Sequence, residues 1–226
     1  MKKNFLLLIS TAFLFILTSC SGNGVSDKSS VLDTANISET SAKESSTGVN
    51  TQKDENSTED YVDNDILVAY FSATGNTEKV ASQIITITGA DTFKIEASVP
   101  YTKEDLDYTN DSCRANREQN DKTFRTEIAG NIENMENYDI VFLGYPIWWG
   151  EEPRIIDTFL ESYDFSDKTV IPFCTSGSSD IAESETNIAK LGVPIGNQLA
   201  GKSFEATASE QSISEWIDTL ELSYKN

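Results

Sequence analysis

The stretch Ile66–Thr77 reads Ile-Leu-Val-Ala-Tyr-Phe-Ser-Ala-Thr-Gly-Asn-Thr, and it decides the fold. Its first six residues, Ile66–Phe71, are mostly apolar and too few for a helix, which is typical of a strand covered on both faces. The chain then breaks into small polar residues around one glycine, and a helical pattern follows. A helix that starts there aims its free N–H groups and its dipole at the space above the strand, where they favour an anion such as a phosphate.

The loop between this strand and this helix offers hydroxyl, amide and backbone donors but no cation. Its residues are Ser72, Ala73, Thr74, Gly75, Asn76 and Thr77. The loop is not a Walker loop, because the Gly-Lys-Ser/Thr ending is missing, and it lacks the three glycines of a dinucleotide loop. An ordinary strand–turn–helix junction, with Asn76 or Thr77 as the helix cap, is the alternative.

The N-terminus predicts export. Two lysines precede the apolar stretch Phe5–Leu17, which is shorter than the roughly 20 residues that span a bilayer and is typical of a secretory signal. The stretch ends in Leu-Thr-Ser-Cys at Cys20. This ending resembles the bacterial lipobox, so residues 1–20 are interpreted as a lipoprotein signal peptide with Cys20 as the lipidated residue. A plain signal peptide or a membrane anchor is the alternative.

Composition divides the rest of the chain into a polar segment and a single domain. Residues 21–64 are rich in Ser, Thr, Asn, Asp and Glu, and they bury too little apolar surface to order, so they are expected to be a disordered tether spanning roughly 35–40 Å. Residues 65–226 suit one domain. This domain has 12 basic and 28 acidic residues, net −16, within a chain of net −20. We therefore expect no nucleic-acid partner, and contact with the membrane only through a lipid anchor.

The chain has no histidine and few cysteines, which limits its chemistry. The absence of histidine excludes Ser-His-Asp and Cys-His catalysis. Beyond Cys20 only Cys113 and Cys174 remain, too few for a zinc cage. We expect Cys174 to be a small core residue and Cys113 a free thiol, although a bridge between them is conceivable outside the cytoplasm. No catalytic side chain and no metal site is predicted.

Helical and strand patterns alternate through the domain. Helices are predicted over Asn76–Thr88, Pro153–Ser162, Asp180–Lys190 and a closing segment with the capping box Ser212-x-x-Glu215. Strands are predicted over Ile66–Phe71, Asp91–Glu96 (exposed on one face, as at an edge), Tyr138–Gly144, Lys168–Cys174 and part of Gln198–Phe204. The polar connection Ser98–Asn137 is expected to hold helices around Lys103–Asp121 and Phe124–Ile132. The alternation predicts a three-layer α/β domain with parallel strands.

In such folds ligands lie beyond the carboxyl ends of the strands, which directs attention to two further loops. One contains Tyr145, Pro146, Ile147, Trp148, Trp149 and Gly150, and the other Thr175, Ser176, Gly177, Ser178 and Ser179. The first offers two indole faces, and the second offers N–H groups and hydroxyls for the polar edge of a planar ring. Packing of Trp148 and Trp149 under the following helix, and simple helix capping by Thr175–Ser179, are the alternatives.

With these motifs the chain resembles the flavodoxin family over nearly all of Ile66–Leu220. The phosphate loop has the form Thr/Ser-x-Thr-Gly-x-Thr, and the Gly-Tyr-Pro-Ile-Trp-Trp-Gly loop and the Pro172–Gly177 segment are similar to a bacterial flavodoxin-like subgroup. The resemblance implies a five-stranded parallel sheet in order 2-1-3-4-5 with FMN at its carboxyl edge. Ser72–Thr77 would hold the phosphate, Trp148 would stack on the isoalloxazine and Ser176–Ser179 would meet its pyrimidine edge. The third loop departs from simple electron-carrier flavodoxins, because it lacks their acidic residue and aromatic.

The resemblance implies an FMN oxidoreductase or electron carrier, lipid-anchored outside the cytoplasmic membrane. Its redox partner would be a quinone, NAD(P)H or a protein, and the flavin would carry the chemistry. The alternative is a non-catalytic extracytoplasmic module that keeps the fold but binds another phosphorylated aromatic or no cofactor. This alternative is considered because FMN is made in the cytoplasm.

Overall fold

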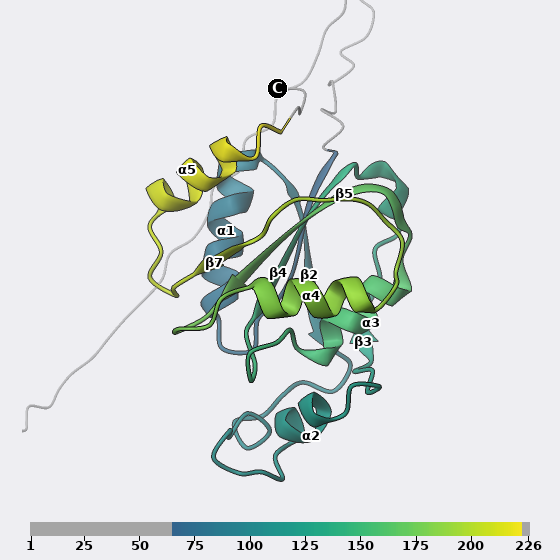
Figure 1. The fold of residues 1–226 in the computed structure, drawn as a ribbon, viewed down its shortest axis with the longest axis vertical. Helices are drawn as coiled ribbons and strands as arrows, with labels where there is room; N and C mark the ends of the chain where they lie inside the picture. The colour runs from purple at the N-terminus through teal and green to yellow at the C-terminus, as the bar shows by residue number, and fades with distance from the viewer. Residues whose placement is uncertain (1–64, 223–226) are drawn as a thin grey trace, which may run out of the picture. The chain divides into compact units, whose positions relative to one another are not determined.

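The computed structural model describes residues 65–222, so the predicted signal peptide, lipidation site and tether lie outside the described residues. A single sheet is covered by helices on both faces (Figure 1). Its strands are β1 (Ile66–Phe71), β2 (Asp91–Ala97), β3 (Ile128–Ala129), β4 (Ile140–Pro146), β5 (Phe165–Thr175), β6 (Ile195–Gln198) and β7 (Lys202–Phe204). The helices are α1 (Asn76–Thr88), α2 (Arg114–Asn120), α3 (Arg154–Ser162), α4 (Ala182–Lys190) and α5 (Glu210–Thr219), with a 3₁₀ turn at Met135–Asn137.

The α/β architecture and its mostly parallel sheet are as predicted. The strand order is β3-β2-β1-β4-β5-β6, with β7 also beside β5, and among the strands of residues 65–222 only the β2–β3 pair is antiparallel. The predicted count of five strands in order 2-1-3-4-5 is therefore wrong. The antiparallel β3 extends the sheet beyond β2, which is not the edge strand that its exposed face indicated.

The strand expected within Gln198–Phe204 is also interrupted, which gives β6 and β7 in its place. Strand β6 pairs with β5 as far as Val170, and β7 pairs with it again from Phe173. Pro172 lies between these two stretches of β5 and has no N–H group to donate to a neighbouring strand. The break in the last strand coincides with this missing donor.

Alternation along β1 explains the three layers. Leu67, Ala69 and Phe71 belong to the core beneath α3 and α4, as do Ile155 and Ile188 from these helices. The other three residues of β1 belong to the core beneath α1 and α5. Since successive side chains of a strand point to opposite faces, a strand with six buried residues must be covered on both. The apolar run Ile66–Phe71 therefore specifies a central strand.

The polar connection between β2 and β4 departs most from prediction. It contains α2, which is shorter than the helix expected over Lys103–Asp121, and the predicted helix over Phe124–Ile132 is absent. In its place Ile128 and Ala129 pair with Ala97 and Glu96. This connection has no continuous apolar stripe, so its shape depends on polar contacts with the rest of the domain.

Helix α5 begins one turn earlier than its predicted capping box. Ser209 has extended backbone angles, and its hydroxyl oxygen accepts a hydrogen bond from the Ser212 N–H at 3.2 Å. The predicted cap, Ser212, lies inside the helix and donates its hydroxyl to the Ser209 carbonyl. Two serines three residues apart compete for this role, and the earlier one lets Ile213 enter the core from within the first turn.

Candidate functional site

The three predicted loops lie together at one edge of the sheet. Strands β1, β4 and β5 are parallel neighbours, so their carboxyl ends share this edge. The Ile147 N–H donates to the Thr175 carbonyl at 3.0 Å, which joins the second and third loops. The hydroxyls of Thr77 and Thr175 lie 2.8 Å apart and are buried, which joins the first and third loops. The first contact joins residues 28 positions apart in sequence, and the second joins residues 98 positions apart.

The first loop is built around Gly75. Its φ of +85° suits glycine, and its N–H donates to the Ser72 hydroxyl at 3.1 Å. The first backbone hydrogen bond of α1 runs from Lys79 to the Gly75 carbonyl. Within residues 65–222, no group accepts from the N–H groups of Asn76, Thr77 and Glu78. Three adjacent unpaired donors at the start of a helix are an arrangement that favours an anion.

The second loop presents Trp148 to the site and keeps Tyr145 away from it. Tyr145 is fully buried, and its hydroxyl lies 3.0 Å from that of Ser184 in α4, so the prediction that Tyr145 contacts a ligand is wrong. Burial raises the pKa of Tyr145 far above its usual range. The Trp148 ring meets Phe71 and Tyr101 edge-to-face, at centroid distances of 5.5 and 5.4 Å. These contacts hold the indole of Trp148 in one orientation.

Trp149 and Gly150 form the tip of the second loop. The backbones of Trp148 and Glu151 exchange two hydrogen bonds, so the two residues between them make a tight turn. Both turn residues have positive φ, +50° for Trp149 and +87° for Gly150. Trp149 is 49% exposed and lines the outer cavity described below. Gly150 shapes the turn but does not line either of the cavities described below.

The third loop is held by hydrogen bonds to the side chain of Ser176. The Ser176 hydroxyl oxygen accepts hydrogen bonds from the N–H groups of Ser178 and Ser179, at 3.2 and 2.7 Å. These two N–H groups are therefore engaged within the loop, and neither residue lines the cavities. Of the five residues predicted in this loop, the structure brings Thr175, Ser176 and Gly177 to the site.

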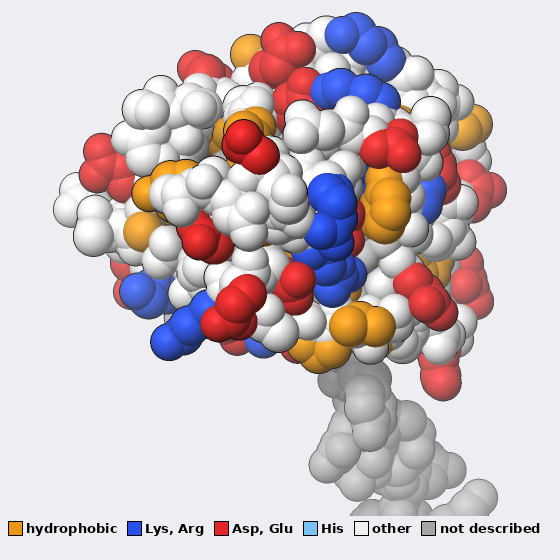
Figure 2. All heavy atoms as spheres, turned by 90° about the horizontal axis from the view of Figure 1, so that it is seen from below, with side chains coloured by type: hydrophobic (Ala, Val, Ile, Leu, Met, Phe, Trp, Pro, Cys, Tyr) orange, Lys and Arg blue, Asp and Glu red, His pale blue; other side chains and the backbone are white. Residues whose placement is uncertain are grey.

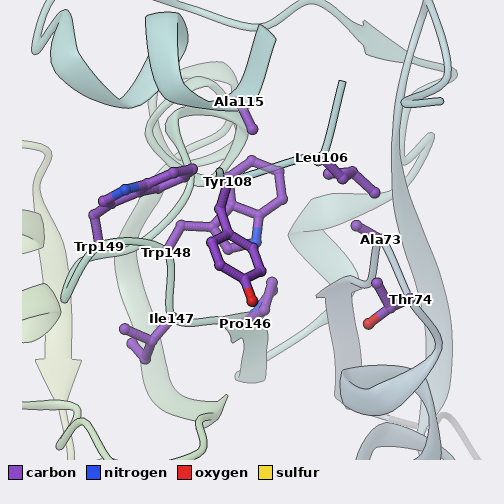
Figure 3. Close-up of a pocket in the computed structure, with 9 residues that line it drawn as sticks. All are labelled: Ala73, Thr74, Leu106, Tyr108, Ala115, Pro146, Ile147, Trp148 and Trp149. Atoms are coloured by element: carbon purple, nitrogen blue, oxygen red, sulfur yellow. The ribbon is translucent and has the colours of Figure 1, made fainter. Parts of the chain in front are cut away.

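Two neighbouring cavities open at this edge. The inner cavity, of about 500 Å³, is lined by residues of all three loops and of the turn after β7: Thr74, Asn76, Pro146, Ile147, Trp148, Thr175, Ser176, Gly177, Glu205, Ala206 and Thr207. The outer cavity, of about 460 Å³, is lined by Ala73, Thr74, Leu106, Tyr108, Ala115, Pro146, Ile147, Trp148 and Trp149 (Figure 3). The cavities share four residues, of which Trp148 is the largest.

The sequence of this chain was compared with those of known protein families. The sequence model described as Flavodoxin matches residues 65–220, which include the whole sheet and all five helices. This chain belongs to the flavodoxin family. None of the curated proteins matches it.

Solved structures of similar proteins support the assignment. A candidate flavoprotein from Bacteroides eggerthii DSM 20697 is 41% identical, with a TM-score of 0.66 over 70% of this chain and 98% of that chain. A second, from Bacteroides uniformis ATCC 8492, is 37% identical, with a TM-score of 0.65 over 68% and 97%. A flavoprotein from Lactobacillus acidophilus NCFM, solved in complex with FMN, is 23% identical and has a TM-score of 0.52 over 68% and 99%. This last likeness shows a shared fold.

Two segments that line the cavities of this flavodoxin-family chain were not predicted from the sequence. Glu205–Thr207 follows β7, and the rule that selected the other loops applies to this turn too, because β7 runs parallel to β5. Leu106, Tyr108 and Ala115 come from the connection between β2 and β4, where the sequence carries no comparable signal. The connection therefore contributes a wall of the outer cavity.

Two sets of polar contacts hold this connection in place. In the first, Glu118 accepts hydrogen bonds from Arg114, Thr126 and the hydroxyl of Tyr101. The Arg114 guanidinium also lies 4.1 Å from the centre of the Tyr101 ring. Burial and the bond to Glu118 raise the pKa of Tyr101 far above its usual range, so this hydroxyl stays protonated. These contacts fix both ends of the connection to each other.

The second set ties α2 to the start of α3. Arg154 is buried and pairs with Glu151, Glu152 and Asp157, at 2.5, 3.2 and 3.1 Å. From α2, the Gln119 side chain donates to the Glu152 carbonyl at 2.9 Å. Burial, together with the charge of Asp157, raises the pKa of Glu152 to about 7. The outer cavity is thus walled by a segment whose attachment depends on buried charges.

The remaining sequence expectations concern cysteines, metals and membranes. Cys113 and Cys174 are both free and buried, and burial raises the pKa of the Cys174 thiol to about 11. Among residues 65–222, no group of Cys, Asp and Glu side chains is placed to hold a metal ion. In the same part of the chain, no helix is long and apolar enough to cross a membrane.

Proposed function

We propose that this flavodoxin-family chain binds FMN in the inner cavity and transfers electrons through it. The observation that carries the proposal is the inner cavity itself. Its lining includes Asn76, the first residue of α1, together with Trp148 and the third-loop residues Thr175–Gly177. A phosphate, an aromatic ring and the polar edge of that ring are the features of FMN that these groups suit.

The donor set fits the cofactor. The N–H groups of Asn76, Thr77 and Glu78 would hold the phosphate, with the Thr74 hydroxyl beside them. Trp148 would contact the ring, and Ser176 and Gly177 would meet its polar edge. The one carboxylate at the cavity, Glu205, is exposed, so solvent screens its repulsion of the phosphate. FMN supplies the redox chemistry when it is bound, and the chain binds it, orients it and limits solvent access.

Titration with FMN tests this assignment. FMN added to the purified protein should quench tryptophan fluorescence and itself lose fluorescence, with a saturable curve. Riboflavin, which lacks the phosphate, is the matched control ligand and should bind at least about tenfold more weakly, since it leaves the α1 donors unpaired. Equal affinity for FMN and riboflavin would contradict the proposal that the N–H groups of α1 bind the phosphate. No uptake of FMN would favour the alternative of a non-catalytic module.

We also propose that the protein acts outside the cytoplasmic membrane, anchored through Cys20. The Leu-Thr-Ser-Cys ending of the N-terminal apolar stretch supports this placement. In bacterial cells the wild-type protein should fractionate with membranes, and Cys20→Ser should release it or leave it unprocessed. A soluble wild-type protein would contradict the anchor without bearing on FMN.

A further inference from the structure

The outer cavity differs chemically from the inner one. Its nine lining residues include no charged side chain, and their polar side-chain atoms are the hydroxyls of Thr74 and Tyr108 and the indole nitrogens of Trp148 and Trp149. The nearby Arg114 donates to Glu118 and to the Val99 carbonyl, at 2.6 and 2.7 Å, so its charge is already paired. A ligand with several phosphates, such as a nicotinamide dinucleotide, would find no cation in this cavity.

The shape of the outer cavity suits a flat ring. The indoles of Trp148 and Trp149 meet at 84° with their centres 6.4 Å apart, and the Tyr108 ring faces the same space (Figure 3). Tyr108 is 74% exposed and Trp149 is 49% exposed, and they are two of the four large hydrophobic residues that are exposed within residues 65–222. Exposed aromatic rings around a cavity gain most from a planar apolar ligand that covers them.

The surrounding surface favours a small molecule over a protein partner. Figure 2 views the molecule from the end at which α2 lies in Figure 1 and shows small hydrophobic patches separated by acidic and basic side chains. A protein interface would need a broader apolar area. A cavity of about 460 Å³ is within the size range of small-ligand sites.

We propose that the outer cavity binds a neutral, planar ring compound of the quinone class beside FMN. The proposal deepens the proposed function by naming its electron acceptor, and it rests on that function for the redox step alone. A quinone held there would contact the Trp148 indole that FMN meets from the inner cavity. It would accept two electrons and two protons from reduced FMN, which gives the quinol and oxidised FMN.

Equilibrium dialysis or calorimetry with 1,4-naphthoquinone tests the site on the full chain, with and without saturating FMN. We expect binding in both cases, and binding of 1,4-naphthoquinone-2-sulfonate that is at least about tenfold weaker, since the cavity has no cation to pair with the sulfonate. Abolition of binding by FMN would overturn the proposal, because the cavity would then belong to the FMN site. Binding of naphthoquinone by a protein that takes up no FMN would overturn the proposed function and leave the cavity assignment standing.

Paired substitutions locate the site. Leu106→Glu places a charge in the outer cavity and should weaken naphthoquinone binding at least about tenfold. Val99→Glu is the matched control, because Val99 is 65% exposed on the same connection and does not line the cavity. FMN affinity should stay unchanged in both, which also verifies folding. If Leu106→Glu does not fold, Tyr108→Ala at its exposed position serves instead. Equal naphthoquinone affinity in the cavity variant and the control would overturn the assignment.

Discussion

Gly75 is the single residue on which the shape of the first loop most depends. Its φ of +85° disfavours any residue with a Cβ, although an added Cβ would meet no atom within 4 Å. Gly75→Ala should therefore lower the free energy of unfolding by about 1–2 kcal/mol through backbone strain alone. It should also weaken FMN binding, because relief of the strain turns the α1 donors. Gly177→Ala is the control, since Gly177 has no positive φ and equally open surroundings. Equal urea midpoints for the two variants would contradict this.

Trp148 is the residue that we expect to contribute most to ring binding. Trp148→Ala should weaken FMN binding by about 0.5–1.5 kcal/mol beyond the loss of buried area, measured by fluorescence of the flavin. Trp149→Ala is the matched comparison, because Trp149 is half exposed and lines only the outer cavity. Since Trp148 also packs on Phe71 and Tyr101, unfolding curves must show that both variants are folded. An effect confined to Trp149→Ala would move the stacking role to that residue.

At the scale of elements, the buried Glu152 carboxyl before α3 should make the stability of the fold depend on pH. The pKa of Glu152 is about 7 in the folded protein, because the carboxyl is buried and lies near Asp157, and about 4.3 in the unfolded chain. Between these values the folded state binds more protons, so stability falls as pH rises and the loss is complete above about pH 7. Glu152→Gln should therefore gain about 1–3 kcal/mol relative to wild type between about pH 5 and pH 8, measured by urea unfolding.

Glu161 provides a control, because its pKa is shifted in the opposite direction to that of Glu152. Hydrogen bonding to Arg125 lowers the pKa of Glu161, so this group is ionised in both states across the same interval. The difference between Glu161→Gln and wild type should stay constant from about pH 5 to pH 8. Parallel curves for Glu152→Gln and wild type would show that the Glu152 carboxyl is solvated or fully compensated by Arg154.

Some elements of the fold could be predicted from the sequence and others could not. β1, its loop and α1 were predicted with their bounds, because the apolar run and the glycine are local signals. Tyr145 was misplaced, although it continues the alternation of Val141 and Leu143 toward the core beneath α4. The alternation of side chains along a strand, with a period of two residues, would have predicted that Tyr145 points into the core. The wall formed by Leu106–Ala115 was not predictable locally, because contacts with residues far along the chain, such as that between Gln119 and Glu152, hold it.

At the scale of the whole molecule, net charge opposes binding of an anion. The chain carries 17 basic and 37 acidic residues, and the first loop would hold the phosphate of FMN with neutral donors. Salt should therefore strengthen FMN binding, since it screens repulsion by the domain and breaks no ion pair with the phosphate. FMN titrations between about 0.01 M and about 0.15 M salt should show rising affinity, and riboflavin should show a smaller change. Falling affinity would indicate a cation at the phosphate.

The two buried cysteines bear on what the domain needs in order to fold. The Cys113 sulfur accepts a hydrogen bond from the Asn116 N–H at the start of α2, and Cys174 lies 2.9 Å from the Ser203 hydroxyl in β7. Within residues 65–222 the fold therefore has no disulfide bond and depends on packing and on non-covalent polar contacts. Dithiothreitol should leave its thermal midpoint unchanged. A domain without a disulfide bond needs no oxidising compartment in order to fold.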